Sequence, residues 1–334
     1  MTWTDSLDSR YIGALGAPSD LTEACELVMR ADTAVRGTTF MSMDFLETIL
    51  SEPGFDRAAD VITVTERSTG ELIAFARFTQ RDPYVSSETI ASVDPDHVGR
   101  GVGGAIIEWG LARANTSIDR APEGTRVTTA LFTNNLNERA KRLFTRKGFA
   151  VARYFLEMEI VLDEPVEVSP LPPGITLRTL RSDEDTGALS AAVDDAFRDH
   201  YGYTKSSPEL DAARWKNWRS SEAWDDELVW LAERDGALVG MNVCIRDHGS
   251  RTNYGYVATL GVLPEARGLG LARCMLTTSF AEYQQRGKEI VALHVDADSI
   301  TGATRLYTGV GMHEVQTEVD FEREIRPGTD LVVR

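Results

Sequence analysis

The residues best suited to chemistry lie in a glycine-rich segment of the second half of the chain, RGLGLA, from Arg267 to Ala272. The segment follows a β-rich run that stops at a proline, and a helical pattern comes after it. Free backbone N–H groups at a helix N-terminus, together with the positive end of the helix dipole, favour a bound phosphate. Glycine lets the backbone approach an anion closely, and Arg267 adds a positive charge with bidentate reach. The segment therefore predicts an anion-binding loop.

Two familiar phosphate loops do not fit this segment. A Walker A loop needs Gly-Lys-Ser/Thr, which the chain lacks after its glycines. A Rossmann loop would follow the first strand, whereas several antiparallel β-runs precede this one. Two alternatives stay open: an ordinary strand-to-helix turn, and a different nucleotide site that ATP or NAD would stabilise.

A second glycine-rich segment, Val93 to Gly104 (VDPDHVGRGVGG), lies in the first half of the chain. The elements around the two segments come in the same order, which predicts an internal duplication. Each half reads as a β-run, a helix, a hairpin, the glycine loop with its helix, a strand, a short helix and a closing strand. In the first half the β-run, helix, hairpin, glycine loop, strand and closing strand lie at 10–15, 19–34, 61–78, 93–104, 127–132 and 154–162, and the short helix ends in 147–149. In the second half they lie at 175–180, 184–197, 228–245, 262–272, 290–295 and 314–321, and the short helix ends in 310–312.

Between the halves lies DEPVEVSPLPPG, from Asp163 to Gly174, which reads as a linker because proline resists both helix interiors and central strands. The sequence thus predicts domains at 1–162 and 175–334, joined by residues 163–174. Both are expected to be of the α/β (α+β) class, each a mixed, mostly antiparallel sheet flanked by helices.

Composition narrows the class of protein. A formal net charge of −17 repels nucleic acid and suits a cationic partner such as an amine, although a soluble acidic surface is the simpler explanation. Apolar runs fall short of the roughly 20 residues that span a bilayer, and the N-terminus lacks the pattern of a secretory signal. The three scattered cysteines support neither a disulfide framework nor a metal site. A cytoplasmic protein without a metal is expected.

The two loops carry a resemblance to a known family. Val262, Pro264, Arg267, Gly270 and Ala272 match the Val-x-Pro and Gln/Arg-x-x-Gly-x-Gly/Ala pattern of the GNAT superfamily of acyl-CoA-dependent N-acyltransferases. The first half matches at Val93, Pro95, Gly101 and Gly103, but Val98 stands where the family has Gln or Arg. The whole chain resembles a tandem member of the family, distantly similar to the two-domain members of the mycothiol synthase type. The sequence does not identify a mycothiol precursor as the substrate.

The resemblance implies that both loops hold the pyrophosphate of coenzyme A. The residues implied to bind it are Leu260, Gly261, Val262, Arg267, Gly268, Leu269, Gly270, Leu271, Ala272 and Ser299 in the second half, and Val93, Gly99, Arg100, Gly101, Val102, Gly103 and Gly104 in the first.

A later helix of the family carries a tyrosine, and the resemblance places Tyr307 there as the general acid that protonates the departing thiolate. The alternative for Tyr307 is an aromatic ring packed in the core. Phe144 occupies the corresponding place in the first half and cannot donate a proton. Backbone N–H groups of the strand before the second loop, Val257 to Val262, are expected to polarise the thioester carbonyl.

Several groups of the sequence could serve as the general base. Family members often carry a carboxylate on that strand, where this chain has Ala258 and Thr259. His200 is one candidate because the segment after the first helix usually lines the acceptor pocket in this family; Asp199, Asp296 and a water relay are others. Trp215 and Trp218 could either wall that pocket or pack in the core.

Because the second half keeps Arg267 and Tyr307, the C-terminal domain is predicted to be catalytic and the N-terminal domain degenerate. The expected reaction moves acetyl from acetyl-CoA to a primary amine of a small molecule or peptide, in a monomer or homodimer. The alternative is a non-catalytic acyl-CoA-binding sensor or scaffold built from two degenerate domains.

Overall fold

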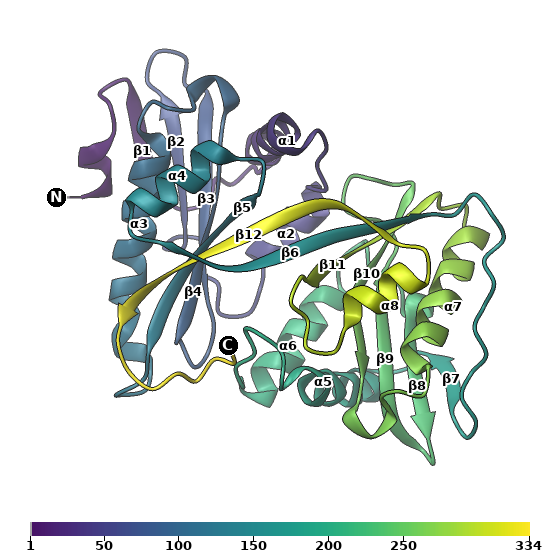
Figure 1. The fold of residues 1–334 in the computed structure, drawn as a ribbon. Coiled ribbons are helices and arrows are strands. Elements are labelled where there is room, and N and C mark those ends of the chain that lie inside the picture. Colours follow the sequence, from purple (N-terminus) through teal and green to yellow (C-terminus); the bar gives the residue numbers. More distant parts are fainter. Residues whose placement is uncertain (1) are drawn as a thin grey trace. The chain divides into compact units, whose positions relative to one another are not determined.

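The computed structural model describes residues 2–334, which form two compact units (Figure 1). Unit 1 runs up to Tyr154 and also includes Glu318–Val332. Unit 2 comprises Phe155–Thr317 with Val333 and Arg334.

Unit 1 contains a mixed sheet in which β4 and β5 pair in parallel, whereas β1–β2, β2–β3, β3–β4 and β5–β12 are antiparallel pairs. Its strands, in spatial order, are β1 (Tyr11–Leu15), β2 (Val61–Glu66), β3 (Leu72–Gln80), β4 (Ser86–Val93), β5 (Val127–Asn134) and, from Glu318 onward, β12 (His313–Arg326). Its helices are α1 (Thr22–Arg36), α2 (Met43–Leu50), α3 (Val102–Thr116) and α4 (Glu138–Arg146).

Unit 2 repeats this plan, with β10–β11 as its parallel pair. Its strands, in spatial order, are β6 (Ala150–Val161), β11 (Ile290–Asp296), β10 (Tyr254–Val262), β9 (Ala237–Ile245), β8 (Val229–Arg234) and β7 (Thr176–Thr179). Its helices are α5 (Asp183–Phe197), α6 (Pro208–Arg219), α7 (Leu271–Gln285) and α8 (Ala303–Gly309). The predicted fold class, two mixed α/β sheets flanked by helices, is confirmed.

The last strand of each half lies in the other unit, where the sequence predicts that each half closes on its own strand. β6 pairs antiparallel with β11, from Phe155↔Asp296 to Val161↔Ile290. β12 pairs antiparallel with β5, from Glu318↔Asn134 to Arg326↔Val127. Duplication makes β5 and β11 similar edges, so either closing strand can satisfy either edge. The compact units therefore differ from the expected division at 1–162 and 175–334, although residues 163–174 do form the loop between β6 and β7.

Local sequence explains the hairpin that precedes the site of unit 2. Asp235 and Gly236 join β8 to β9, and both have positive φ, 52° and 81°. That is the backbone of a tight hairpin turn, which Asp-Gly adopts with little strain. The turn starts the β8–β9 pairing, whose register shifts between Ala232 and Glu233. Beyond the shift, Met241 and Val243 face α5 and Asn242 faces α7.

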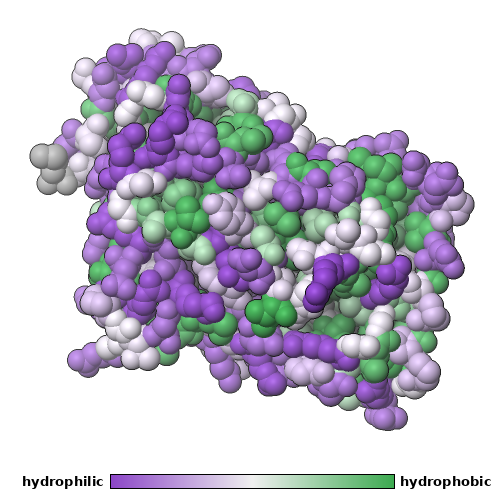
Figure 2. Space-filling view, in the orientation of Figure 1, coloured by the Kyte–Doolittle hydropathy of each residue, from purple (hydrophilic) through white to green (hydrophobic). Residues whose placement is uncertain are grey.

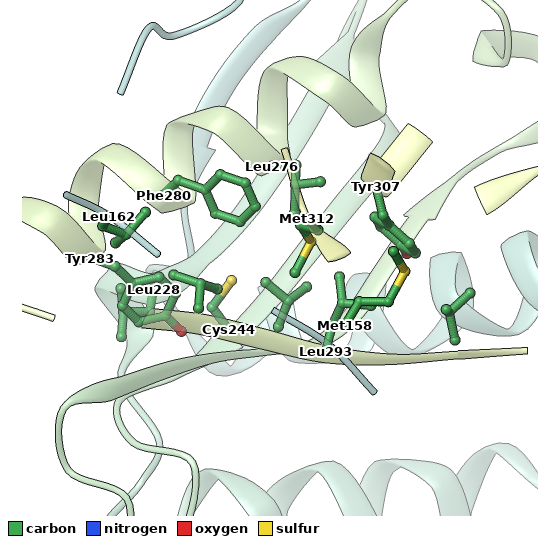
Figure 3. Packing of buried hydrophobic residues seen from close by; sticks show 13 residues of the cluster. Met158, Leu162, Leu228, Cys244, Leu276, Phe280, Tyr283, Leu293, Tyr307 and Met312 are labelled. Atoms are coloured by element: carbon green, nitrogen blue, oxygen red, sulfur yellow. The ribbon is translucent and has the colours of Figure 1, made fainter. Parts of the chain in front are cut away.

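The two faces of the unit 2 sheet carry different helices. Apolar side chains of α7 and α8 pack on one face, and Figure 3 shows this cluster with Tyr283 at one end and Tyr307 at the other. Side chains of α5 and α6 pack on the opposite face against β8 and β9. The strand residues between these layers alternate between the faces, as the pleat requires.

The visible surface is mostly hydrophilic, with small scattered apolar areas (Figure 2). Within residues 2–334, no helix has the length and hydropathy needed to cross a membrane. The three cysteines, Cys25, Cys244 and Cys274, are buried free thiols.

Candidate functional site

The central feature of unit 2 is the end of the pairing between its two parallel strands. β10 and β11 pair from Tyr254↔Ile290 to Val257↔Leu293, although β10 continues to Val262 and β11 to Asp296. In the described register, the β11-facing edge of β10 is thus unpaired from Ala258 onward. Such an edge presents backbone donors and acceptors that an extended ligand can pair with.

A β-bulge begins where this edge opens. The register of β10 with β9 shifts between Val257 and Thr259, which leaves Ala258 as the extra residue. The side-chain pattern confirms the shift, because Val257 faces α7 before the bulge and Leu260 faces α7 after it, three positions later. A bulge leaves its extra residue outside the ladder and re-aims the local backbone.

The glycine loop connects β10 to α7 through a short 3-10 turn at Pro264–Ala266. Gly268 and Gly270 have φ of 77° and 84°, values that disfavour any side chain. Gly270 is the N-cap of α7 and has no side chain with which to occupy the first N–H groups of the helix. Leu269 is exposed, whereas Leu271 is buried, so the loop presents backbone rather than apolar side chains at its tip.

Arg267 does not extend freely from this loop. Its guanidinium donates to the carbonyl oxygens of Val262 (3.1 Å) and Ala196 (2.9 Å) and to the Asp199 carboxylate (2.9 Å). The hydrogen bond from Arg267 holds the pKa of Asp199 below its usual value. These contacts form a brace between the loop and the end of α5. The contact of Arg267 with an anion stays a prediction.

The other residues implied to bind coenzyme A in this half have defined surroundings. Leu260 and Val262 pack toward α7, and Gly261 lies so close to Met241 that a Cβ there would sit 2.5 Å from its sulfur. Ala272 is half-buried in the first turn of α7. The Ser299 hydroxyl lies 3.0 Å from that of Thr301, in the turn after β11. These residues can offer backbone groups at the open edge and the helix start.

Tyr307 lies on α8 and is 7% exposed, within the cluster that also holds Met158 and Met312 (Figure 3). Burial raises the pKa of Tyr307 to about 12, so the phenol keeps its proton at neutral pH. Phe144, its counterpart in unit 1, packs edge-on against Phe321 with ring centroids 5.4 Å apart.

His200 follows the end of α5, beside the brace. Its ring packs on Phe197, with centroids 4.7 Å apart, and its Nε2 is 3.6 Å from Asp199. Burial lowers the pKa of His200, while the charges of Asp199 and Asp296 partly offset that effect. The structure therefore brings together His200, Asp199 and Arg267, with Asp296 close enough to act on His200.

The tryptophans belong to the core. Trp215 meets Trp224 edge-on, with centroids 6.1 Å apart, and both pack with Trp218 in the cluster between α5, α6 and the sheet. The Trp224 indole donates to Asp226 (2.7 Å). The packing alternative accounts for Trp215 and Trp218.

Unit 1 has a similar glycine loop between β4 and α3, but the strand before it is regular where that of unit 2 is bulged. Gly99 and Gly101 have φ of 88° and 91°, Val102 is buried at the start of α3, and Arg100 is exposed. A Cβ on Gly103 would lie 3.2 Å from Leu143 of α4, and one on Gly104 4.0 Å from Lys147. Val93, the last residue of β4, packs toward α3. The β3–β4 register runs from Ala74↔Val93 to Gln80↔Ser87 without a shift, so β4 is regular where β10 is bulged.

One group of polar side chains at the opening was not predicted from the sequence. The Tyr256 hydroxyl lies 2.9 Å from His294 Nδ1, and His294 Nε2 lies 4.0 Å from the buried Glu157 carboxylate. Tyr256 is two residues before the bulge, and His294 directly follows Leu293, the last residue of β11 that pairs with β10. Strand alternation places both on the face opposite α7, a signal that was present once these strands were assigned.

Comparison with known proteins matches this architecture. The family model described as acetyltransferase (GNAT) family matches residues 23–149 and again 190–312. The chain belongs to the GNAT family. The two matches confirm the duplication, and the chain is an N-acetyltransferase of a family that uses acetyl-CoA.

Individual proteins resemble the chain over most of its length. The mycothiol acetyltransferase of Frankia casuarinae is 34% identical over 83% of this chain and 79% of its own length. A GCN5-related N-acetyltransferase structure from Sphaerobacter thermophilus has a TM-score of 0.79 at 30% identity and covers 97% of this chain and 98% of that one. A tandem GNAT protein from the clavulanic acid biosynthesis pathway shares the fold, with a TM-score of 0.70 at 16% identity over 95% of this chain and 99% of its own.

Proposed function

We propose that unit 2 transfers acetyl from acetyl-CoA to a primary amine of a small molecule or peptide, with Tyr307 as general acid. The observation that carries this proposal is the coincidence, in unit 2, of an open strand edge, a bulge and an uncapped helix start with a buried tyrosine. Unit 1 has the helix start, but its β4 is regular and its α4 carries Phe144.

Successive parts of acetyl-CoA would each meet one of these groups. The N–H groups from Gly268 to Ala272 would hold the pyrophosphate, because they converge at the positive end of α7. The pantetheine arm, an extended chain of amides, would pair with the open edge of β10. A backbone N–H freed by the bulge at Ala258 would donate to the thioester oxygen as negative charge develops on it.

The acidity of Tyr307 sets the timing of proton transfer. Its pKa of about 12 lies roughly 3.5 units above that of an ordinary thiol, about 8.5, so full transfer to a solvated thiolate would cost about 5 kcal/mol. A thiolate leaving inside the same dry cluster also has a raised pKa. The phenol thus stabilises the departing sulfur by a hydrogen bond first and gives up its proton once the C–S bond has broken.

The alternative is a sensor that binds acyl-CoA without turnover, favoured by Ala258 and Thr259 standing where family members often carry a carboxylate. In the catalytic proposal residues 175–334 supply the glycine loop and Tyr307, and residues 1–162 form a degenerate domain with Val98 and Phe144 in place of Arg267 and Tyr307. In the sensor both domains are degenerate. We also place the enzyme in the cytoplasm, as a monomer or homodimer, in keeping with its three free thiols.

The test is acetyl-CoA turnover with a panel of amines: glucosamine, spermidine, a peptide with a free N-terminus, and mycothiol lacking its acetyl group. The last is included because the relative from Frankia casuarinae carries mycothiol in its name. Tyr307→Phe is expected to lower kcat by about 10²-fold with the KM for acetyl-CoA little changed, as for loss of a general acid. Phe144→Leu is the matched control and should leave kcat unchanged. Binding of acetyl-CoA without turnover of any amine would favour the sensor, and stabilisation by ATP or NAD instead would refute both.

A further inference from the structure

We propose that Tyr256 and His294, supported by Glu157, form the proton acceptor for the attacking amine. This inference rests on the proposed function of unit 2 and supplies the general base that the sequence left open. It assigns the role to two residues 38 positions apart in the chain.

Tyr256, His294 and Glu157 lie on one face of the unit 2 sheet. Val257, Leu293 and Met158 all pack in the cluster under α7 and α8, so their neighbours Tyr256, His294 and Glu157 face the other side of the sheet. Tyr307 approaches from the α8 side. The opening between β10 and β11 thus has a buried proton donor on one face and the Tyr256–His294 pair on the other. An amine attacking the thioester from the α5 side would meet that pair.

Tyr256 is held in place at its backbone and at its ring. The Tyr283 hydroxyl accepts the backbone N–H of Tyr256 (3.1 Å) and donates to the carbonyl oxygen of Ile245 (2.6 Å), which fixes the strand. His248 stacks flat on the Tyr256 ring, with centroids 4.3 Å apart and planes 18° apart. The ring therefore has one orientation, in which its hydroxyl meets His294 Nδ1. Preorganisation of this kind is what a catalytic group needs.

Exposure to solvent rises from Glu157 to His294, so the pair can exchange a proton with solvent at its His294 end. Glu157 and His248 are 1% and 5% exposed, whereas the His294 side chain is 22% exposed. The charged groups that face the pair are Glu157 from β6 and, behind it, Arg251, which donates to Glu157 (2.7 Å), contacts His248 and approaches Glu159 (3.3 Å). Burial raises the pKa of Glu159. Asp296 lies two residues along β11.

These groups give a balanced step. As the C–N bond forms, the amine nitrogen gives a proton to the Tyr256 oxygen while the Tyr256 hydroxyl proton moves to His294 Nδ1. The imidazolium then directs Nε2–H toward Glu157. The C–S bond breaks while the Tyr307 hydroxyl donates a hydrogen bond to the sulfur, and the thiolate then takes the proton of Tyr307. Solvent returns a proton from His294 to Tyr307. Tyr256 is the catalytic residue here, and Glu157 is a positioning residue that acts through His294.

The kinetic test compares His294→Gln, Tyr256→Phe and their double variant, with whichever amine of the panel the parent chain acetylates fastest. Each single variant is expected to lose about 10²-fold in kcat, with the KM for acetyl-CoA within about twofold. The double variant should lose no more than either single variant, because both residues serve one proton transfer. The acid limb of the kcat/KM profile should disappear in His294→Gln. In Glu157→Gln it should move to lower pH, since the imidazolium loses a stabilising charge.

The matched control is Tyr254→Phe, on the same face of β10 with its ring under Arg251 (4.4 Å), which should keep the parent profile. Parent-like kinetics in both single variants would overturn this inference alone, and so would loss of the acid limb in His200→Gln but not in His294→Gln. A parent chain that acetylates no amine would refute the proposed function as well.

A measurement without turnover checks the coupling itself. The chain has five histidines, so the C2–H resonance of each can be assigned by single substitution and followed by NMR against pH. Glu157→Gln should lower the titration midpoint of His294, and Tyr256→Phe should shift it while leaving that of His313 unchanged. A His294 resonance indifferent to both changes would contradict the relay.

Discussion

Arg267 acts as a brace rather than a free cation. Its three acceptors are two backbone carbonyls and one carboxylate, so the guanidinium is occupied before any ligand arrives. What it contributes is order: the loop is held against the end of α5 in the conformation that presents its N–H groups. Ordering a loop in advance removes an entropic cost from binding.

Arg267→Met is expected to raise the Kd for acetyl-CoA about tenfold, roughly 1.4 kcal/mol, with little change in kcat. The reason is that the loop must be ordered at the moment of binding. Isothermal titration gives the Kd. Asp199→Asn should produce part of the same effect, and the double variant should not exceed Arg267→Met alone. A Kd unchanged in Arg267→Met would show that the loop holds its conformation without the brace.

Asp320, in unit 1, gives a prediction on pH. Burial, followed by the charges of Glu88, Glu318 and Glu322, raises the pKa of Asp320 to about 7 from 3.8. The folded chain therefore binds this proton more tightly than the unfolded chain, and its stability falls as pH rises from about 4 to about 7. Asp320→Asn should stabilise the protein at about pH 8 by at most about 4 kcal/mol, and by less at about pH 5. Urea unfolding at the two pH values measures the difference.

Glu324→Gln is the control for Asp320→Asn. Glu324 lies on the same strand with a 45% exposed side chain that pairs with Arg126. Its stability difference from the parent should vary little between the two pH values. Equal pH dependence in the Asp320 and Glu324 variants would mean that Asp320 is already ionised in the folded state at neutral pH.

At the scale of elements, the two glycine loops offer a matched pair. Gly270 and Gly101 are the N-caps of α7 and α3, with φ of 84° and 91°. Gly270→Ala and Gly101→Ala should each lower stability by about 1 kcal/mol, because alanine is strained at positive φ. Only Gly270→Ala is expected to weaken acetyl-CoA binding, by about tenfold. An equal loss of affinity in Gly101→Ala would assign coenzyme A to unit 1 as well.

Much of the element order could be read from the sequence, because its signals are local. Asp235-Gly236 predicted a hairpin turn, and the glycine loops predicted the starts of the helices that follow them. The helix α6 was missed although Ser207 and Pro208 form a standard start, with the Ser207 hydroxyl accepting from the Leu210 N–H. The bulge at Ala258 could not be read, since it depends on how β9 and β10 register. The Tyr256–His294 contact depends on the same pairing.

At the scale of the whole molecule, the exchange of closing strands makes each half of the chain depend on the other. Fragments 1–168 and 169–334 should each be poorly folded alone, because each lacks the strand that completes its sheet. Mixed or co-expressed, they should form a 1:1 complex with the secondary structure of the parent, which circular dichroism and sedimentation can show. Fragments that each fold cooperatively on their own would contradict this dependence.

The sequence could not predict which closing strand, β6 or β12, pairs with which sheet edge, β5 or β11. The closing strands of both halves have similar lengths and follow similar helices, so local pattern fits either pairing. Contacts between residues about 200 positions apart decide the matter: Arg126 donates to Glu322 (2.9 Å), Glu324 (2.8 Å) and Asp330 (3.0 Å). Such distant pairings leave no periodic trace in the chain.

The pairing of β12 with β5 also bears on synthesis. Strand β5 ends at Asn134, but the segment of β12 that covers its edge, Glu318–Arg326, is translated much later. At about 5–20 residues per second, the nascent chain waits on the order of ten seconds or more between making the edge and making the strand that covers it. Throughout that interval the β5 edge is open on the ribosome, where another chain could pair with it. Each half of the chain is therefore indispensable to the other, since each donates the strand that closes the other's sheet.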